Sequence, residues 1–186
     1  MPTTPTLKIH INYWSLLHEG DPTTEQGLRT HLSLVREAGF QGYCGTSDFP
    51  KIKELIQEYG LRFGGAFDAG RVEQFAPKIA ALMAIDNGPI NCQLADHDTP
   101  TDEAVALTIA LMAEAKKQNA PVHLEVHRDT CTETPEKAAA IVAGALVSQV
   151  ELVVFLHKAQ PQHANSELTV LLPGSALAAV ADELGH

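Results

Sequence analysis

Apolar and polar positions along this chain form short strand-like runs that alternate with longer amphipathic stretches typical of helices. The first run, residues 7–14, places Leu7, Ile9 and Ile11 between polar neighbours, as in a strand with one buried face. Such runs recur about every thirty residues, the length of one right-handed strand-helix-strand unit, which predicts a parallel sheet. The expected strands occupy residues 7–14, 39–46, 61–70, 89–96 and the run that begins at 122.

Residues that start and stop helices stand where this alternation needs them. Ser47 or Asp48 can cap the second expected helix, and Gly60 can end it in a left-handed conformation. Thr134 and Pro135 are a cap and a first helical residue for the helix after the fifth strand. Strand and helix boundaries therefore agree along the first part of the chain.

One face of each expected strand carries polar or small side chains, whereas the other face is apolar. A doubly wound sheet is covered by helices on both faces, but a barrel meets helices only on its outside. The pattern therefore predicts an α/β fold of the (β/α) TIM-barrel type, with its site at the carboxyl ends of the strands. The residues expected to point inward, strand by strand, are His10, Asn12 and Trp14; Gln41, Tyr43 and Gly45; Arg62, Gly64, Ala66 and Asp68; Asn91, Gln93 and Ala95; and His123, Glu125 and His127.

The length of the chain predicts an incomplete barrel. A full barrel of this type typically needs about 250 residues, but this sequence has 186, which suits a single domain. Five regular units span residues 7–148, and the remaining 149–186 form a divergent tail. Within the tail, residues 150–159 can add a sixth strand, 168–175 form a short apolar run, and 176–186 suit a final helix. We expect a truncated barrel with an irregular C-terminal part.

The composition of the chain limits the classes of partner that it is expected to bind. The net charge of -10, without a basic cluster, argues against nucleic acid, because that affinity depends on Lys and Arg. Cys44, Cys92 and Cys131 are too far apart for a zinc motif or a disulfide framework, which predicts a reducing, cytoplasmic setting. No secretion leader and no run of about 18 apolar residues is present, so neither export nor a membrane span is expected. A small-molecule substrate is the expected partner.

The strongest candidate chemistry lies on the fifth expected strand. His123, Glu125 and His127 occupy alternate positions, whose side chains project about 6 to 7 Å apart on one face. Imidazole nitrogens and carboxylate oxygens both bind divalent metal ions, but these three are too spread to share one ion. Glu125 with His127, joined by groups from neighbouring strands, is the plausible metal site, and Glu125 can also act as a general base. The alternative is a solvated strand face without chemistry.

Further candidates lie at the ends of the first and fourth strands. Gln93 points inward, and His97 follows it at the strand end, where it can approach the same pocket. The alternative for the stretch around His97 is an Asx or Thr turn that caps the next helix through Asp98 and Thr99. Asn12 and Trp14 end the first strand as candidate substrate contacts, with Trp14 expected as a packed lid over the barrel mouth.

Four segments, "INYWSL", "GLRFGGAF", "CQLADHD" and "HLEVHRDTCTETPEK", resemble the sugar-phosphate isomerase/epimerase group of the xylose isomerase-like barrel superfamily, across residues 7–145. The resemblance implies a barrel that binds a divalent metal (Mn, Mg, Co or Zn) and moves a proton or hydride next to a sugar carbonyl. Glu125 matches the metal-binding glutamate of the fifth strand. His127 and Arg128 match residues expected to face the substrate.

The later part of the sequence departs from that family. The resemblance implies an aspartate and a histidine at the sixth strand and a glutamate at the eighth, but between residues 138 and 186 the only aspartate is Asp182. The leading hypothesis is a metal-dependent sugar isomerase or epimerase. The missing ligands favour an alternative, a noncatalytic half-barrel that associates as a homo-oligomer through the exposed edge of its last strand. An endonuclease of abasic DNA, from the same superfamily, is disfavoured by the acidic charge.

Overall fold

The computed structural model describes residues 9–145, 152–156 and 168–172. Its sheet follows the order of the chain, from β1 to β7, with each strand beside the next. The strands are β1 (His10–Asn12), β2 (Gly42–Gly45), β3 (Arg62–Ala69), β4 (Ile90–Leu94), β5 (Val122–Val126), β6 (Leu152–Leu156) and β7 (Leu168–Leu172). The helices are α1 (Glu25–Glu37), α2 (Ile52–Tyr59), α3 (Phe75–Met83), α4 (Thr101–Lys117) and α5 (Pro135–Ala145), with short 3-10 helices η1 (Tyr13–Leu16) and η2 (Val72–Gln74).

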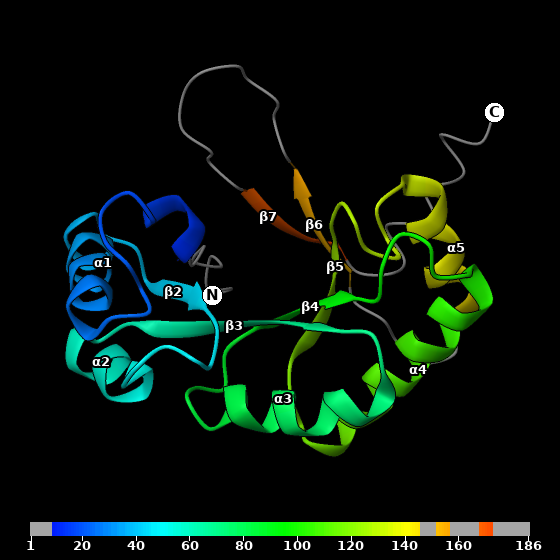
Figure 1. Ribbon diagram of the computed structural model, residues 1–186, viewed down its shortest axis with the longest axis horizontal. Helices are drawn as coiled ribbons and strands as arrows, with labels where there is room; N and C mark the ends of the chain where they lie inside the picture. The colour runs from blue at the N-terminus through cyan, green and yellow to red at the C-terminus, as the bar shows by residue number, and fades with distance from the viewer. Residues whose placement is uncertain (1–8, 146–151, 157–167, 173–186) are drawn as a thin grey trace, which may run out of the picture.

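This sheet is a curled half-barrel. Strands β1 to β6 run parallel, and β7 returns antiparallel to β6. Helices α1 to α5 follow the outside of the curve, as Figure 1 shows. Within the described residues β1 pairs only with β2, and β7 only with β6, so the sheet does not close. The expected TIM-barrel type with an incomplete barrel is confirmed. Among the described helices, none has the length and hydrophobicity that a membrane span requires.

The predicted boundaries hold for most elements. Thr134 precedes α5, which begins at Pro135, and Gly60 ends α2 at a φ of 66°. The start of α2 was wrong: the helix begins at Ile52, after Lys51, whose φ is 53°. The expected sixth strand is present as β6, whereas the helix expected at 176–186 lies outside the described residues.

The core fills the space between the sheet and the outer helices. Its members are apolar side chains that alternate along the strands and recur on the inner faces of the helices. They bury nearly all of their surface, which is the main stabilising contribution to such a fold. Among them are Leu28, Leu32, Phe63, Phe75, Ile79, Ile90, Leu94, Leu111 and Leu124.

The predicted inward face of β2 was wrong. Tyr43 is fully buried on the helical side, where its hydroxyl lies 3.0 Å from Nδ1 of His31 on α1. Gly42 and Cys44 take the concave face instead, and the ring of His10 covers Gly42. The error arose because a four-residue strand with two glycines and an amphipathic Tyr carries no clear alternation.

His31 forms a buried polar link between α1, β2 and the loop before α1. Its Nε2–H donates to the carbonyl of Gly20 at 2.9 Å, and the Tyr43 hydroxyl donates to Nδ1. Burial lowers the pKa of His31, because a charged imidazole is poorly solvated there. The neutral ring with its proton on Nε2 satisfies both of these hydrogen bonds.

This burial predicts acid sensitivity. Because the folded-state pKa of His31 lies below its unfolded value of about 6.5, its contribution to stability is complete above that pH and is lost as the pH falls further. Measured by urea denaturation, the free energy of unfolding of the wild type should be lower at pH 5 than at pH 7. This difference should be smaller in His31→Gln. His18→Gln, at an exposed histidine, should leave that loss unchanged. Equal loss in all three proteins would contradict the assignment.

Candidate functional site

The carboxyl ends of the parallel strands meet at one rim of the half-barrel, as expected for a barrel-type site. There the register aligns Asp68 on β3 with Gln93 on β4. Two residues nearer the amino end of β4, Asn91 is aligned with His123 on β5. The amide Nε2 of Gln93 lies 3.4 Å from Oε1 of Glu125 on β5. Asp68, Gln93 and Glu125 thus form a row across three strands on the concave face.

The members of this row differ in exposure. Glu125 is 7% exposed, Gln93 is half-buried, and Asp68 is exposed. The charge of Asp68 also reaches Tyr13, whose pKa is raised first by burial and then by that carboxylate. With strands about 4.8 Å apart, Asp68 and Glu125 stand two strand spacings from each other. The row therefore lines up two carboxylates and one amide along the rim.

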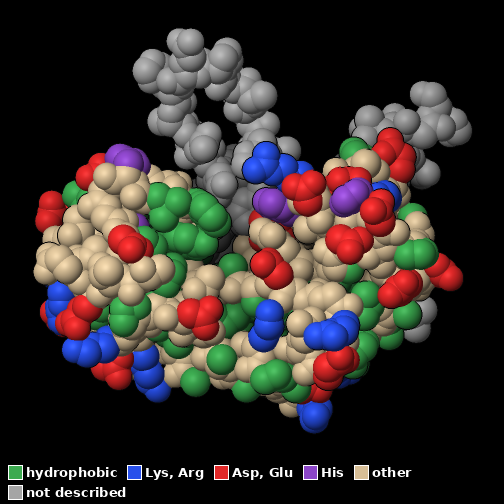
Figure 2. All heavy atoms as spheres, viewed as in Figure 1, with side chains coloured by type: hydrophobic (Ala, Val, Ile, Leu, Met, Phe, Trp, Pro, Cys, Tyr) green, Lys and Arg blue, Asp and Glu red, His purple; other side chains and the backbone are tan. Residues whose placement is uncertain are grey.

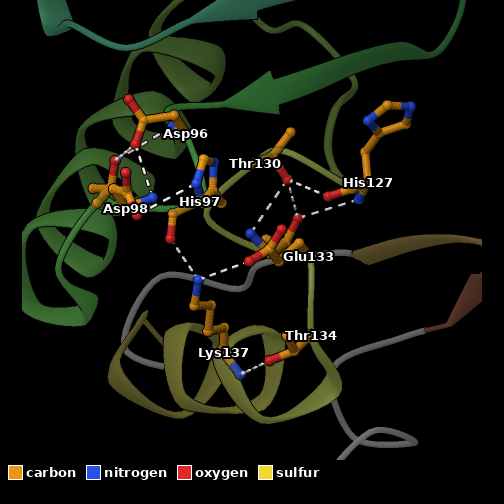
Figure 3. Close-up of polar contacts among 10 residues, drawn as sticks. Asp96, His97, Asp98, His127, Thr130, Glu133, Thr134 and Lys137 are labelled. Carbon is orange, nitrogen blue, oxygen red and sulfur yellow. Dashed lines mark hydrogen bonds and ion pairs between the residues drawn. The ribbon is translucent and has the colours of Figure 1, made fainter.

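Two threonines fix the backbone beside Glu125. The hydroxyl of Thr132 donates to the Glu125 carbonyl at 2.7 Å, and Thr130 Oγ1 lies 2.9 Å from Thr132 Oγ1. Thr130 also donates to the carbonyl of His127 at 2.7 Å. Both threonines are buried, and Figure 3 shows the Thr130 contacts. No strand or helix pattern marks these residues, so sequence analysis missed them.

Replacing Thr132 with valine keeps its shape but removes these hydrogen bonds. We expect Thr132→Val to lower the free energy of unfolding by about 1–3 kcal/mol, because the Glu125 carbonyl loses its hydroxyl donor. Thr108→Val is the matched control, since Thr108 is also buried and donates to a carbonyl, but on α4. Urea denaturation should show a loss in both, whereas amide exchange at Glu125 and Val126 should rise only in Thr132→Val. Unchanged exchange there would refute the positioning role.

His127 and Arg128 lie past the end of β5. Nδ1 of His127 is 2.6 Å from the Arg128 carbonyl, so the ring is turned toward its own loop, and Figure 3 shows it apart from the other labelled residues. The Arg128 side chain is exposed and approaches Asp129 at 4.0 Å. The structure therefore brings Gln93 to Glu125, whereas the contacts described for His127 and Arg128 lie within their own loop.

The loop after β4 forms a turn of its own. Asp96 Oδ1 accepts hydrogen bonds from the backbone of Asp98 and from the Thr99 hydroxyl, which is an Asx turn. His97 is half exposed, and its Nε2 lies 3.3 Å from Asp98. Lys137 on α5 donates to the His97 carbonyl and to Glu133, so it ties this loop to the next one (Figure 3). His97 is thus held within the loop after β4 at the rim.

Asn12 and Trp14 flank the rim at β1. Asn12 Oδ1 accepts the backbone N–H of Trp14 at 3.1 Å and thereby caps η1. Trp14 is 62% exposed, and its ring centroid lies 4.9 Å from that of Tyr13. Figure 2 shows hydrophobic side chains over η1 on one side of a hollow, with charged and histidine side chains on the other side.

Strained backbone occurs at several of these strand ends. Ala95 follows β4 at a φ of 52°, and Asp129 follows β5 at a φ of 61°. Lys51, in the loop after β2, has a φ of 53°. Residues other than glycine rarely adopt this left-handed conformation, and such strain is concentrated at functional sites.

A metal ion would need more ligands than this rim displays. Glu125 supplies a carboxylate and Gln93 an amide oxygen, both of which are suitable donors. Across the described residues, no three His, Cys, Asp or Glu side chains are arranged to hold a metal ion. The described donors alone therefore do not make a complete metal centre.

No family model matches this sequence, and no curated protein matches it. Solved structures do match. A D-allulose 3-epimerase from Methylomonas sp. aligns over 75% of this chain and 59% of its own, with 17% identity and a TM-score of 0.60. An L-ribulose 3-epimerase aligns over 82% and 60%, with 18% identity and a TM-score of 0.57. The probable 3-DHS dehydratase AsbF from Bacillus anthracis aligns over 80% and 62%, with 13% identity and a TM-score of 0.54.

These comparisons establish the fold. The fold of this chain is similar to that of the two epimerases, which supports the architecture expected from the sequence. This chain spans about three fifths of the length of each of these neighbours. At such low identity, similar folds can carry different chemistry.

Proposed function

We propose that this protein is a sugar or sugar-phosphate isomerase/epimerase-like enzyme in which Glu125 moves a proton next to a carbonyl. The observation that carries the proposal is the nearly buried Glu125 carboxylate at the rim, beside the Gln93 amide. The epimerase fold neighbours support the reaction class.

The chain's own residues suggest a division of labour. In an isomerisation, Glu125 removes the proton from the hydroxyl-bearing carbon beside the carbonyl and returns it to the former carbonyl carbon, while the hydroxyl proton passes to the carbonyl oxygen. Gln93 orients the Glu125 carboxylate through its amide, and Asp68 accepts hydrogen bonds from sugar hydroxyls at the open side. Asn12, Trp14, His97 and Arg128 are proposed rim contacts, with Arg128 positioned to meet a phosphate.

The proposal includes a divalent ion bound by Glu125, with His127 as a second ligand once its ring turns away from the Arg128 carbonyl. Calorimetric titration of Mn²⁺, Co²⁺ and Zn²⁺ into wild type and Glu125→Ala tests that part. Incorporation of solvent deuterium into a panel of ketohexoses and their phosphates, followed by NMR, tests the reaction itself. Exchange at the carbon beside the carbonyl is expected. If no exchange occurs either with or without metal, the proposed enzymatic activity is contradicted.

The open sheet favours a second candidate, a noncatalytic half-barrel that associates through a strand edge. Within the described residues, β1 has a neighbour only on its β2 side, and unpaired edges promote association. Ile9, Trp14 and Leu17 next to this edge are exposed apolar side chains. Light scattering should then show a homo-oligomer, with amide protection at residues 9–12. A monomer with unprotected amides there would rule this candidate out.

A further inference from the structure

The segment between β1 and α1, residues 13–24, forms a strap that lies against the start of α1. It contains η1, and Figure 2 shows hydrophobic side chains over η1 at one side of the hollow. Only Pro22 of the strap is buried, and Trp14 is 62% exposed. A segment that buries so little side-chain surface is expected to open at a lower free energy than the core.

Backbone contacts with α1 hold the strap in place. A Cβ atom added at Gly20 would lie 3.0 Å from Cα of Gly27, and one added at Gly27 would lie 2.1 Å from the carbonyl oxygen of Asp21. The strap and the helix therefore touch through their backbones. Near the start of the strap, the ring centroid of Tyr13 lies 5.2 Å from that of Phe49 in an edge-to-face contact.

His31 on α1 is the polar anchor of the strap. Its side chain is 0% exposed. Nε2 lies 2.9 Å from the carbonyl oxygen of Gly20 in the strap, and Nδ1 lies 3.0 Å from the hydroxyl of Tyr43 on β2. Protonation would place a hydrogen on Nδ1, so the Tyr43 hydroxyl would have to turn its own proton away. The closed strap therefore fits a neutral ring and accepts a charged one only at a cost in free energy.

Ionisable groups of the strap act on His31. Burial has the largest effect and lowers the pKa of His31. The charges of Glu19 and Asp21 favour a protonated ring, whereas His18 disfavours it. Because both carboxylates are exposed, solvent weakens their effect. Burial raises the pKa of Tyr13, so this phenol stays neutral as the pH falls.

Strand β2 and helix α2 pack against the same helix. Burial raises the pKa of Tyr43 on β2, so this phenol also stays neutral in acid. The charges between α1 and α2 are paired with each other: Arg29 contacts Glu58, and Glu25 contacts Lys51, both at 2.7 Å. The buried imidazole is therefore the group at the contact between helix and strap whose charge depends on pH in mild acid.

We propose that His31 is an acid-sensitive latch: protonation of its imidazole releases residues 13–24 from α1 while the sheet and the outer helices stay folded. The ring takes up one proton, and water solvates the imidazolium once the strap has moved. Because the released ring has an ordinary pKa of about 6.5, the ratio of open to closed strap rises by at most about tenfold per pH unit below that value. The latch involves no substrate, so it does not depend on the proposed epimerase activity.

Amide hydrogen exchange in the wild type, compared at pH 7 and pH 5 after correction for intrinsic rates, tests the latch. The backbone N–H groups of Glu19 and Thr24 bond within the strap, at 2.8 and 3.0 Å, and that of Ile90 bonds between β4 and the residue before β5. Protection of Glu19 and Thr24 should fall about tenfold as the NMR signal of the His31 ring titrates. It should also stay at least about tenfold below that of Ile90.

Two results would overturn the latch in this experiment. Equal protection at Glu19, Thr24 and Ile90 would mean that the strap opens only when the whole protein unfolds. Titration of His31 without a fall in the protection of Glu19 and Thr24 would separate the ring from the strap. Both results come from the wild type, so they hold even if a variant fails to fold.

Trp14, the only tryptophan in the chain, reports on the strap directly. Its fluorescence anisotropy should fall between pH 7 and pH 5, because a released strap moves more freely. The fall should be lost in His31→Gln, whose side chain does not titrate, and kept in His18→Gln, at an exposed histidine of the strap. A constant anisotropy in the wild type, or a fall that persists in His31→Gln with a wild-type circular dichroism spectrum, would contradict the latch.

Discussion

Replacing Glu125 with glutamine should reduce solvent-deuterium exchange into the sugar by about 10²–10⁴-fold, the range expected when a positioned general base is removed. The substitution keeps the size of the side chain and its place beside Gln93, but the amide cannot accept the substrate proton. The NMR assay that defines the wild-type activity measures the loss directly. The effect should fall on kcat, because the lost interaction belongs to the proton transfer.

One control variant and one measurement of folding separate this result from a general loss of structure. Glu103→Gln removes an exposed carboxylate from the first turn of α4 and should leave exchange unchanged. Circular dichroism should show the same fold for Glu125→Gln as for wild type. Exchange that persists at the wild-type rate in folded Glu125→Gln would remove Glu125 from the proton-transfer step and leave the half-barrel without its proposed base.

Replacing Gly27 with alanine should destabilise the protein by about 1–3 kcal/mol, the cost of overpacking a close contact. In an isolated helix the same change would stabilise by about 1 kcal/mol, because alanine is the better helix former. In this fold an added Cβ would lie 2.1 Å from the carbonyl oxygen of Asp21. Since a backbone atom cannot rotate aside, either the loop or α1 must shift.

The loop has little freedom to move. The Asp21 carbonyl accepts hydrogen bonds from the backbone and the hydroxyl of Thr24, and the adjacent Gly20 carbonyl accepts one from His31. Thr30→Ala on the same helix is the control, and it should be neutral or slightly stabilising because its position is half exposed. Urea denaturation measures both. A gain of stability in Gly27→Ala would show that the loop accommodates the methyl group at no cost.

The fold was largely predictable because its signals are local. Each strand and helix depends on residues within one or two turns, as at the Thr134 and Pro135 start of α5 and the Gly60 end of α2. The concave position of Glu125 followed from the alternation along β5, whose apolar members Leu124 and Val122 are buried. Where alternation is weak, as around Tyr43, the predicted face was wrong.

The candidate site was predictable only in part. Gln93 and Glu125 were identified separately, but their contact joins residues 32 positions apart and depends on the register of β4 against β5. His127 was expected to face the site, yet the chain turns after Val126 and its ring meets the Arg128 carbonyl instead. Whether these residues bind a metal or a sugar remains a prediction.

The sequence by itself determined the order of strands and helices, the half-barrel class and the glutamate on the fifth strand. It did so because hydrophobic periodicity and helix caps are set by near neighbours in the chain. Only the tertiary structure decided which strands lie in register, so it alone placed Gln93 beside Glu125 and His31 between Gly20 and Tyr43. Such pairings depend on how whole elements pack, and one residue of slip in a strand would reverse every face.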